Sequence, residues 1–588
     1  MNRKTSQSYS VSTLLKTNEH ATMAILAVLV GLAAGLGAVG FRHLINFVQT
    51  IAYGSSQELL GVVQAIPWNM KVWIPAAGGI VVGPLVYFLA REAKGHGVPE
   101  VMEAVALKSG IIRKRIVLVK SLASAICIGT GGSVGREGPI VQIGSAIGST
   151  IGQTLRISGD RIKTLVGCGA AAGIAATFNA PIAGAMFALE VILGEFGLAT
   201  FSPIVISAVV ATAVSRHFLG NMPAFIVPAY ELVSAWELPI YVVLGFFCAL
   251  VAVSFTKLLY VIEDYFEAIK FPEYLKAVLG GLILGIMALP IPYVLGVGYG
   301  AIDMALLQNL SWWMMFLLII CKIAATSITI GSGGSGGIFA PSLFMGAMAG
   351  GFFGSVVHTI FPGITAAPGA YSIVGMGAVV SGTTHGPLSA ILILFEMTGD
   401  YKIILPLMIA CIISTLASGH LLKDSIYTLK LARRGVNIKS GKEINVLKAI
   451  SVKDVMSAQV ETIPENLSLG KLAEKIAKSK FNSFPVVDVA GNLTGVLSYM
   501  DYHDVAFDEN LKDLVVAKEL ATPKVVTVSA DDNLYNAFEK LSSRDFSILP
   551  VVSPEDPSRL MGILTRRDII GAYDKAVVKK TLFKEGQA

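Results

Sequence analysis

The chain has 588 residues, of which 54% are hydrophobic and 15% are charged. This length exceeds that of a single compact domain, and this hydrophobicity excludes a disordered or a wholly water-soluble protein. Most of the chain is therefore expected to lie in a lipid bilayer.

Charge divides the chain into two parts. From Val436 onward there are 20 Lys and Arg and 21 Asp and Glu, which leaves 26 and 19 in the first 435 residues. We expect a membrane body followed by a water-soluble tail. The net charge of +6 is typical of positive cytoplasmic loops, and no basic patch alternates with aromatic residues, so nucleic acid is not an expected partner.

The body begins with a polar, basic segment, residues 1–20, which we expect on the cytoplasmic side. The apolar run that follows lies too deep and is too long for a cleavable signal. Further runs long enough to enter or cross a bilayer recur along the body. The predicted spans are Ala21–Gly40, Val72–Ala90, Pro203–Leu219, Leu238–Val253, Ala277–Leu295, Trp312–Ala325 and Ile403–Leu422.

Between these spans lie apolar segments that Gly and Pro interrupt, namely Ile116–Ile151, Leu165–Phe196 and Gly331–Thr398. Non-helical backbone at membrane depth is stable only where it is buried in protein or lines an aqueous cavity. The interrupted segments therefore indicate a permeation path.

Two pairs of motifs indicate an internal duplication. Gly131–Pro139 resembles Gly333–Pro341 at an offset of 202 residues, and Asn179–Glu190 resembles His385–Glu396 at an offset of 206. Both pairs occur in the same order at nearly one offset. Duplicated halves that meet at broken helices are typical of transporters with a binding site near the bilayer midplane.

Three motifs place Gly shortly before a Pro that can open a helix: Gly95-His-Gly-Val-Pro99, Gly135-Arg-Glu-Gly-Pro139 and Gly337-Ile-Phe-Ala-Pro341. A helix that begins at membrane depth presents free N–H groups and the positive end of its dipole. We expect the three helix starts to converge on one dehydrated anion.

Two charges stand inside apolar sequence, where a charge is costly. Glu137 next to an anion path would compete with the anion when ionised and release the path when protonated, so we predict a gate, a proton carrier or both. The alternative is a salt bridge to Arg136. Lys120 would raise the positive potential of the site, unless it extends to the membrane surface.

The tail contains a second repeat. Phe484–Asp488 and Gly495–Asp501 are echoed by Ile548–Val552 and Gly562–Asp568, and an amphipathic helix pattern precedes each pair, at Leu469–Lys480 and Asn533–Ser542. We predict two small βαββα-like modules. Ser498-x-x-Asp501 and Thr565-x-x-Asp568 follow a strand in each module, where they fit either the phosphate and ribose of an adenine nucleotide or a plain helix cap.

These motifs resemble those of the CLC family of chloride channels and proton-coupled chloride transporters, together with Asp424-Ser-Ile-Tyr427 and the segment His385–Tyr401. The tail resembles a tandem pair of CBS domains. The resemblance implies an all-α polytopic membrane protein with inverted repeats and broken helices, followed by a C-terminal α/β tandem CBS module. It also implies a homodimer in the lipid bilayer with a chloride pore in each subunit.

The resemblance assigns roles to single residues. Glu137 corresponds to the gating glutamate, Lys120 to a buried electrostatic lysine, and Tyr427 to a tyrosine whose hydroxyl binds the anion, unless its ring is simply packed in a core. The expected anion-binding residues are Gly95, His96, Gly97, Arg136, Gly138, Ile338, Phe339 and Tyr427. The expected nucleotide-binding residues are Ser498, Asp501, Thr565 and Asp568, with ATP, ADP or AMP as the regulatory ligand.

Two positions depart from the family pattern. His96 stands where the family commonly has Ser, and it can donate to the anion, take a charge, or turn away into packing or a vestibule. Val191 stands where many family exchangers carry a proton-transferring glutamate, next to Glu190. Because an aliphatic side chain relays no proton, we expect channel-like conduction, with a proton-coupled chloride exchanger as the alternative.

The expected domains are a cytoplasmic segment (1–20), the transmembrane domain (21–434), a linker (435–448), two CBS domains (449–510 and 511–580) and a terminal tail (581–588). We expect a prokaryotic inner (plasma) membrane with both termini cytoplasmic. A CBS-regulated cation channel would need acidic rings or a hydrated carbonyl filter, and a membrane-anchored nucleotide sensor would need no duplicated broken helices. Neither an enzyme nor a metal site is expected, since the chain has no Walker loop, zinc motif or nucleophile elbow and the apolar setting of its five cysteines is typical of core residues.

Overall fold

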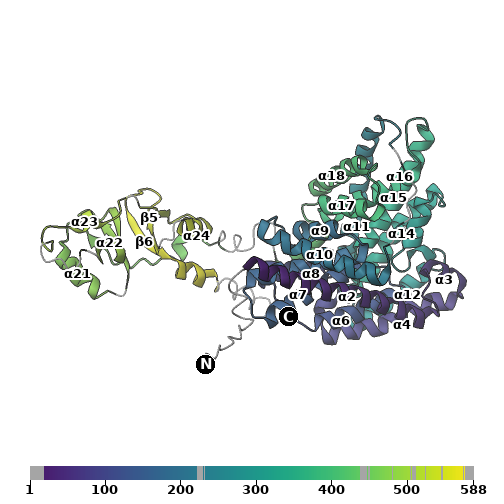
Figure 1. The fold of residues 1–588 in the computed structure, drawn as a ribbon, viewed down its shortest axis with the longest axis horizontal. Coiled ribbons are helices and arrows are strands. Elements are labelled where there is room, and N and C mark those ends of the chain that lie inside the picture. Colours follow the sequence, from purple (N-terminus) through teal and green to yellow (C-terminus); the bar gives the residue numbers. More distant parts are fainter. Residues whose placement is uncertain are drawn as a thin grey trace, which may run out of the picture. The chain divides into compact units, whose positions relative to one another are not determined.

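The computed structural model describes residues 19–221, 225, 230, 232–436, 447, 450–479, 481–503, 505, 511–523, 525–543, 547–573 and 575. The chain forms two compact units, Met1–Val436 and Asn437–Ala588, which we call the helical unit and the C-terminal unit (Figure 1). Almost all of the predicted cytoplasmic segment, most of the linker 435–448 and the terminal tail 581–588 lie outside the described residues.

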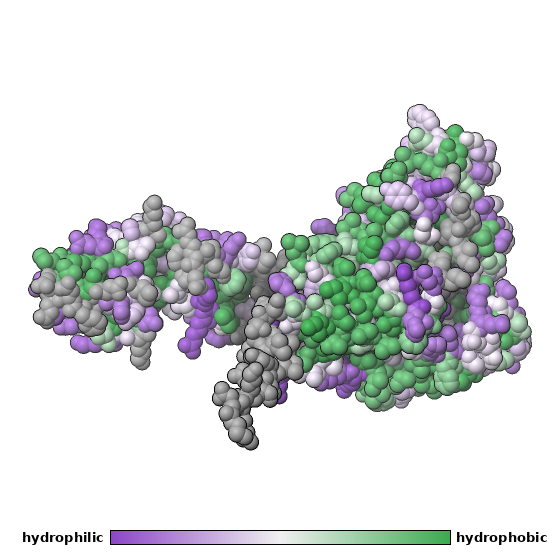
Figure 2. Space-filling view, in the orientation of Figure 1, coloured by the Kyte–Doolittle hydropathy of each residue, from purple (hydrophilic) through white to green (hydrophobic). Residues whose placement is uncertain are grey.

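In the described part of the helical unit, seven helices are long and apolar enough to cross a membrane. They include α2 (Glu19–Tyr53), α4 (Trp68–Pro84), α10 (Leu198–Leu219), α11 (Glu237–Ala268), α14 (Trp312–Gly331), α15 (Phe339–Ile360) and α18 (Ile404–Leu421). Apolar side chains cover a broad area of this unit's visible face (Figure 2). The expectation of a multi-pass membrane protein is confirmed.

One predicted span is shorter than expected. The run Ala277–Leu295 forms α12 (Lys276–Met287), which ends before Pro290. Proline has no N–H to donate and its ring collides with the preceding turn, so Pro290 and Pro292 cannot continue the helix.

The loop before residue 116 and the interrupted segments contribute further helices of the helical unit, most of them shorter than the spans above. They are α5 (Val98–Leu107), α6 (Ile116–Gly129), α7 (Glu137–Thr154), α8 (Gly159–Phe178), α9 (Pro181–Phe187), η3 (Ala188–Leu193), α16 (Pro368–Thr384) and α17 (Pro387–Thr398). The remaining elements are α3 (Leu59–Ala65), η1 (Leu85–Leu89), η2 (Arg91–Ala93), η4 (Glu273–Leu275), η5 (Pro292–Val294), α13 (Tyr299–Leu306) and α19 (Ile426–Arg433).

The helical unit is an internal duplication. Helix α7 packs on α6 and α8 in the first half, as α15 packs on α14 and α16 in the second. Helices α4 and α9 pack on α12 and α17, their own copies. Such reciprocal contacts are those of a twofold axis, so the predicted inverted repeats are confirmed.

Two carboxylates show this symmetry at the level of atoms. Glu190, in η3 directly after α9, accepts hydrogen bonds from the N–H groups of Leu388 (3.1 Å) and Ser389 (2.7 Å) at the start of α17. Glu396, near the end of α17, accepts from the N–H groups of Ile182 (3.1 Å) and Ala183 (2.7 Å) at the start of α9. Each half therefore caps a helix of the other half.

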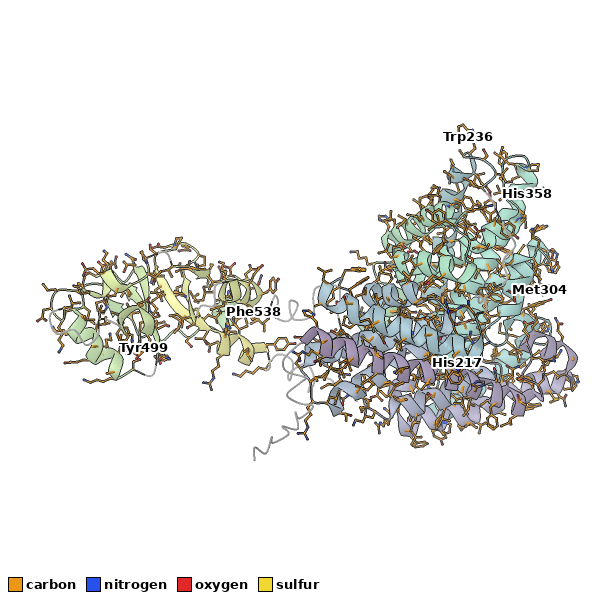
Figure 3. All side chains as sticks on the ribbon, in the orientation of Figure 1. His217, Trp236, Met304, His358, Tyr499 and Phe538 are labelled. Atoms are coloured by element: carbon orange, nitrogen blue, oxygen red, sulfur yellow. The ribbon has the colours of Figure 1, made fainter. Side chains whose placement is uncertain are left out.

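A further buried carboxylate fixes one end of the helical unit. Glu237 Oε1, at the start of α11, accepts from the N–H of Ala366 (2.6 Å) and the hydroxyl of Tyr371 (2.8 Å). Trp236, which precedes α11, and His358, near the end of α15, lie at this same end (Figure 3). The carboxylate is buried, and these donors compensate for its lost hydration.

The C-terminal unit contains two three-stranded sheets with one topology. The first comprises β1 (Ile463–Pro464), β2 (Ser483–Val487) and β3 (Leu493–Ser498), with α21 (Leu469–Ala477) between β1 and β2 and α22 (Tyr499–His503) after β3. The second comprises β4 (Val528–Ser529), β5 (Ile548–Val552) and β6 (Leu560–Thr565), with α24 (Leu534–Ser543). In each sheet the first two strands are parallel, β1 with β2 and β4 with β5. The last two strands are antiparallel, β2 with β3 and β5 with β6. The predicted α/β pair is confirmed.

The two modules exchange chain segments. Leu447 and Val452, which precede the first sheet, pack in the core under β5 and β6. Leu511 and Ala517, which precede the second sheet, pack on the core of the first, beside the short helix α23 (Ala517–Leu520). These contacts cross the predicted division at residues 510 and 511.

Candidate functional site

Three helix starts meet at one place in the helical unit. Gly135, before α7, and Gly337, before α15, exchange two backbone hydrogen bonds of 2.7 and 2.6 Å. Gly95, before α5, accepts from Gly336 N–H (3.3 Å) and donates to the carbonyl of Gly334 (3.1 Å). The three motifs singled out in the sequence therefore lie side by side.

Glycine makes this close approach possible. A side chain at Gly138 would collide with the carbonyl of His96 and the Cα of Gly337. Gly97, the residue before α5, has a φ of +84°, a conformation that residues with a Cβ rarely adopt. Both positions admit only glycine without rearrangement.

Glu137 is the first residue of α7 and is 1% exposed. Its Oε1 accepts a hydrogen bond of 2.8 Å from the hydroxyl of Tyr299, the first residue of α13, while its Oε2 has no hydrogen-bond partner in the described part of the chain. The carboxylate lies against Gly135 and Ala340, beside the start of α15. A negative group thus rests between two helix N-termini, whose dipoles favour it.

Arg136 does not pair with Glu137 among the described residues. Its guanidinium lies over the ring of Tyr299, 5.5 Å from the ring centroid, and its Nε is buried without a hydrogen-bond partner in the described ranges. Arg136 therefore contacts the ring of Tyr299 while Glu137 contacts its hydroxyl, and the salt-bridge alternative finds no support here.

Lys120 is fully buried on α6. Its ammonium donates to the carbonyls of Ala93 (3.0 Å) and Gly95 (2.8 Å), so it does not extend to the membrane surface. The contact directs a full positive charge at the loop that opens α5 and holds that loop in shape.

His96 and Tyr427 face each other, with ring centroids 5.6 Å apart. His96 is 1% exposed, and neither of its ring nitrogens has a hydrogen-bond partner among the residues that the structure describes. Tyr427 is buried on α19, and no hydrogen bond of its hydroxyl occurs within the described part of the chain. Buried polar groups normally find partners, so the two unpartnered ring nitrogens of His96 suggest an occupant that the protein itself does not supply.

The remaining predicted anion-binding residues lie at the start of α15. Ile338 precedes the helix and Phe339 begins it, so their N–H groups belong to the uncapped first turn. The Phe339 ring packs on Phe178 and Phe187, with centroids 5.5 and 6.4 Å apart. This packing holds the first turn of α15 in its orientation.

Val191 lies in η3 and is buried beside Gly386, at the position before α17. Glu190, the acid next to it, is engaged with the N–H groups of α17 and also accepts from the hydroxyl of Ser389 (2.6 Å). Its carboxylate therefore has a capping role in the structure.

In the C-terminal unit, Ser498 and Thr565 end equivalent strands. The N–H of Ser498 donates to Asp501 Oδ2 (2.6 Å), and that of Thr565 donates to Asp568 Oδ2 (2.9 Å). The Thr565 hydroxyl also donates to Asp568 Oδ2 (2.6 Å). Both pairs thus form helix caps, which leave Oδ1 of each aspartate without a hydrogen bond in the described part of the chain.

Sequence reasoning missed two partners of the site. Tyr299 holds Glu137, and Lys322 donates to the carbonyls of Val294 (3.1 Å) and Gly296 (2.9 Å), as Lys120 does in the other half. A third repeat at an offset of 201, Gly95-x-Gly97 and Gly296-x-Gly298, would have indicated a second helix start like that of α5, and extending the duplication further would have indicated Lys322. Among the described residues no group of three or more His, Cys, Asp and Glu side chains could hold a metal ion.

Comparisons with known proteins agree with this geometry. A family model described as "Voltage gated chloride channel" matches residues 78–419, and a CBS domain model matches residues 452–505 and 517–575. The chain is 37% identical to the "Putative chloride channel protein ClcB-like" of Ralstonia nicotianae, over 70% of this chain and 97% of that protein. It is 33% identical to the "H(+)/Cl(-) exchange transporter ClcA" of Vibrio parahaemolyticus, over 71% and 90%.

Solved structures share the fold. A slow cyanobacterial Cl⁻/H⁺ antiporter superposes with a TM-score of 0.64 at 27% identity and covers 70% of this chain and 97% of its own. A eukaryotic CLC transporter superposes with a TM-score of 0.63 at 20% identity and covers 93% and 97%. The duplicated broken helices, the converging helix starts and these matches together show that the chain belongs to the CLC family of voltage-gated chloride channels and carries a tandem CBS pair.

Proposed function

We propose that the helical unit conducts chloride through a pathway between the starts of α5, α7 and α15, with Glu137 as its gate. The observation that carries this proposal is the meeting of three helix N-termini near the ring of His96, which faces Tyr427 and whose two nitrogens are buried without a hydrogen-bond partner among the described residues. Partial positive charge at helix starts holds an anion without the strong binding of a full cation, so the anion can leave again.

The carboxylate of Glu137 lies between the starts of α7 and α15, a position whose positive partial charge favours an anion. An ionised Glu137 in this position excludes chloride by direct competition and by repulsion. Protonation removes the charge of Glu137 and therefore its attraction to the two helix N-termini. The side chain can then leave, which opens the path to chloride. Tyr299 holds the closed position through its hydroxyl.

Near His96, at what we call the central site, the anion would accept hydrogen bonds from the N–H groups of Ile338 and Phe339 and from the Tyr427 hydroxyl. His96, with two free ring nitrogens, supplies a further N–H donor in its neutral form. We propose this donor role for His96, in place of the serine that the family commonly carries there.

We propose a channel-like mechanism because Val191 cannot relay protons and Glu190 is engaged as a helix cap. A proton-coupled exchanger is the second candidate, favoured by the relative from Vibrio parahaemolyticus, whose name describes an H⁺/Cl⁻ exchange transporter. The two differ in whether a proton gradient does work on chloride.

Reversal potentials in proteoliposomes decide between them. With a fixed chloride gradient, a channel gives a reversal potential that a superimposed pH gradient does not move. A shift with a fixed chloride-to-proton ratio would overturn the channel mechanism and establish the exchanger. Free passage of a metal cation without halide flux would overturn anion transport altogether.

We further propose that an adenine nucleotide binds at the Ser498 and Thr565 caps of the CBS pair and biases the pore through residues 435–448. We also propose that the protein is a homodimer, that it lies in a prokaryotic inner membrane, and that both of its termini are cytoplasmic. The apolar exposed side chains of α18 support the homodimer, and the basic residues of the N-terminal segment support the orientation.

A further inference from the structure

A cavity of about 250 Å³ lies beside the gate. Its walls include Arg42 and Asn46 of α2, Glu58, Arg136, and Gly298 and Tyr299 at the start of α13. It shares Arg136 and Tyr299 with the gate, and of the described residues His96, Phe339 and Tyr427 do not line it. The cavity is therefore separate from the central site and reaches the gate through Tyr299, whose hydroxyl donates to Glu137.

Two arginines face this cavity. Among the described residues neither Arg42 nor Arg136 forms an ion pair with a carboxylate, and Arg136 Nε is buried with no hydrogen-bond partner. Two guanidinium groups in one cavity repel each other unless an anion lies between them. Their planar sets of N–H donors suit such an anion.

The cavity also contains the helix start that duplicates the start of α5 in the other half of the helical unit. Helix α13 begins after Gly298, which has a φ of +90°, as α5 begins after Gly97. Lys322 holds the loop before α13 by its carbonyls, as Lys120 holds the loop before α5. The N-cap position Gly298 makes no side-chain cap, and within the described ranges no side chain accepts a hydrogen bond from the first N–H groups of α13, so these groups add their positive partial charge to that of the arginines.

One carboxylate, that of Glu58, also lines the cavity. Its side chain is exposed and lies against Gly300 in the first turn of α13. A carboxylate at this place competes with a free anion for the same donors. Glu58 therefore has an effect opposite to that of Arg42.

We propose that this cavity is a second anion-binding site, which takes a small inorganic anion such as a halide and loads it toward Glu137. Arg42, Arg136 and the start of α13 bind the anion, and Glu58 limits its occupancy. This inference rests on the proposed anion transport, since it adds a site on the path that the gate closes.

Two exposed positions allow the test on the full chain in proteoliposomes. Halide flux is measured as a function of chloride concentration, varied on one side of the membrane at a time. Arg42→Gln should raise the half-saturating concentration roughly three- to tenfold on the side onto which the cavity opens, and Glu58→Gln should lower it there. The value on the opposite side should not change.

Two further variants act as controls. Arg42→Lys keeps the charge and should retain most of the wild-type affinity. Lys402→Gln removes an exposed positive charge that does not line the cavity and should leave both half-saturating concentrations unchanged. Equal shifts on both sides, shifts of the same sign in Arg42→Gln and Glu58→Gln, or no shift would each overturn the proposal.

Anomalous scattering from bromide in crystals of the full chain gives a direct readout. The wild type should show bromide between Arg42 and Arg136, and Arg42→Gln should lose that peak. Bromide confined to the region of His96 and Tyr427 would overturn the second site and leave the proposed function intact. Absence of any halide flux in the wild type would instead overturn the proposed function.

Discussion

At the scale of the residue, Glu137 is placed to couple protonation to conduction. Glu137→Gln keeps an acceptor for the Tyr299 hydroxyl and removes the ionisable group. We therefore expect flux that persists at neutral pH and loses most of its dependence on pH. Chloride flux into liposomes, measured from acidic to neutral pH, checks this.

The matched control is Glu195→Gln, which removes an exposed carboxylate after η3. It should keep the wild-type pH profile. A Glu137→Gln protein that shows the same steep pH dependence as the wild type would contradict the gating role.

Tyr427 allows a second test at this scale, because its hydroxyl has no partner within the described chain. A hydrogen bond to a charged group is worth about 1.5–3 kcal/mol, so Tyr427→Phe should weaken chloride binding by roughly tenfold or more. Calorimetric titration of chloride into the purified protein measures this. Tyr499→Phe in the C-terminal unit is the control, and equal affinities in the two variants would show that the Tyr427 hydroxyl does not contact the anion.

At the scale of the element, the two buried lysines provide a matched pair. Lys120→Met and Lys322→Met each leave two loop carbonyls without their donor, which should cost about 1–3 kcal/mol. We expect both variants to unfold at a lower temperature than the wild type. Lys257→Met, at an exposed position of α11, should melt as the wild type does. Two buried variants as stable as Lys257→Met would show that the lysines do not hold the loops.

The sequence predicted what is local and missed what depends on distant packing. The motif Gly135–Pro139 could be identified from the sequence because its glycines, its proline and one energetically costly carboxylate stand within five residues. The role of Tyr299 could not be predicted in this way, because Tyr299 contacts Glu137, 162 residues away, only when folding brings the first residues of α13 and α7 together. Lys322 lies 202 residues after Lys120, and extending the duplication to it would have predicted its role.

At the scale of the whole molecule, the apolar face of α18 carries the proposed homodimer. Leu405, Met408, Ile412 and Leu416 are exposed at spacings of three and four residues, so they share one face. Ile412→Trp adds bulk that an interface between proteins cannot accept and lipid can. We expect a halved mass by light scattering, with flux retained if each subunit holds its own pathway. Val243→Trp, at an exposed position of α11, is the control, and an unchanged mass of Ile412→Trp would exclude this face.

The C-terminal unit provides the last prediction, because its two caps leave Asp501 and Asp568 with one carboxylate oxygen outside the capping bond. That oxygen can accept from the ribose hydroxyls of an adenine nucleotide while the helix start favours its phosphate. Asp568→Asn keeps a capping acceptor and removes the charge, so it should leave thermal stability almost unchanged and lower nucleotide affinity roughly tenfold. Calorimetry of the full chain with ATP, ADP and AMP measures binding, and flux with each nucleotide measures its effect on the pore. Heat without any change in flux would separate binding from regulation, and no heat with any of the three would leave the caps with a purely structural role.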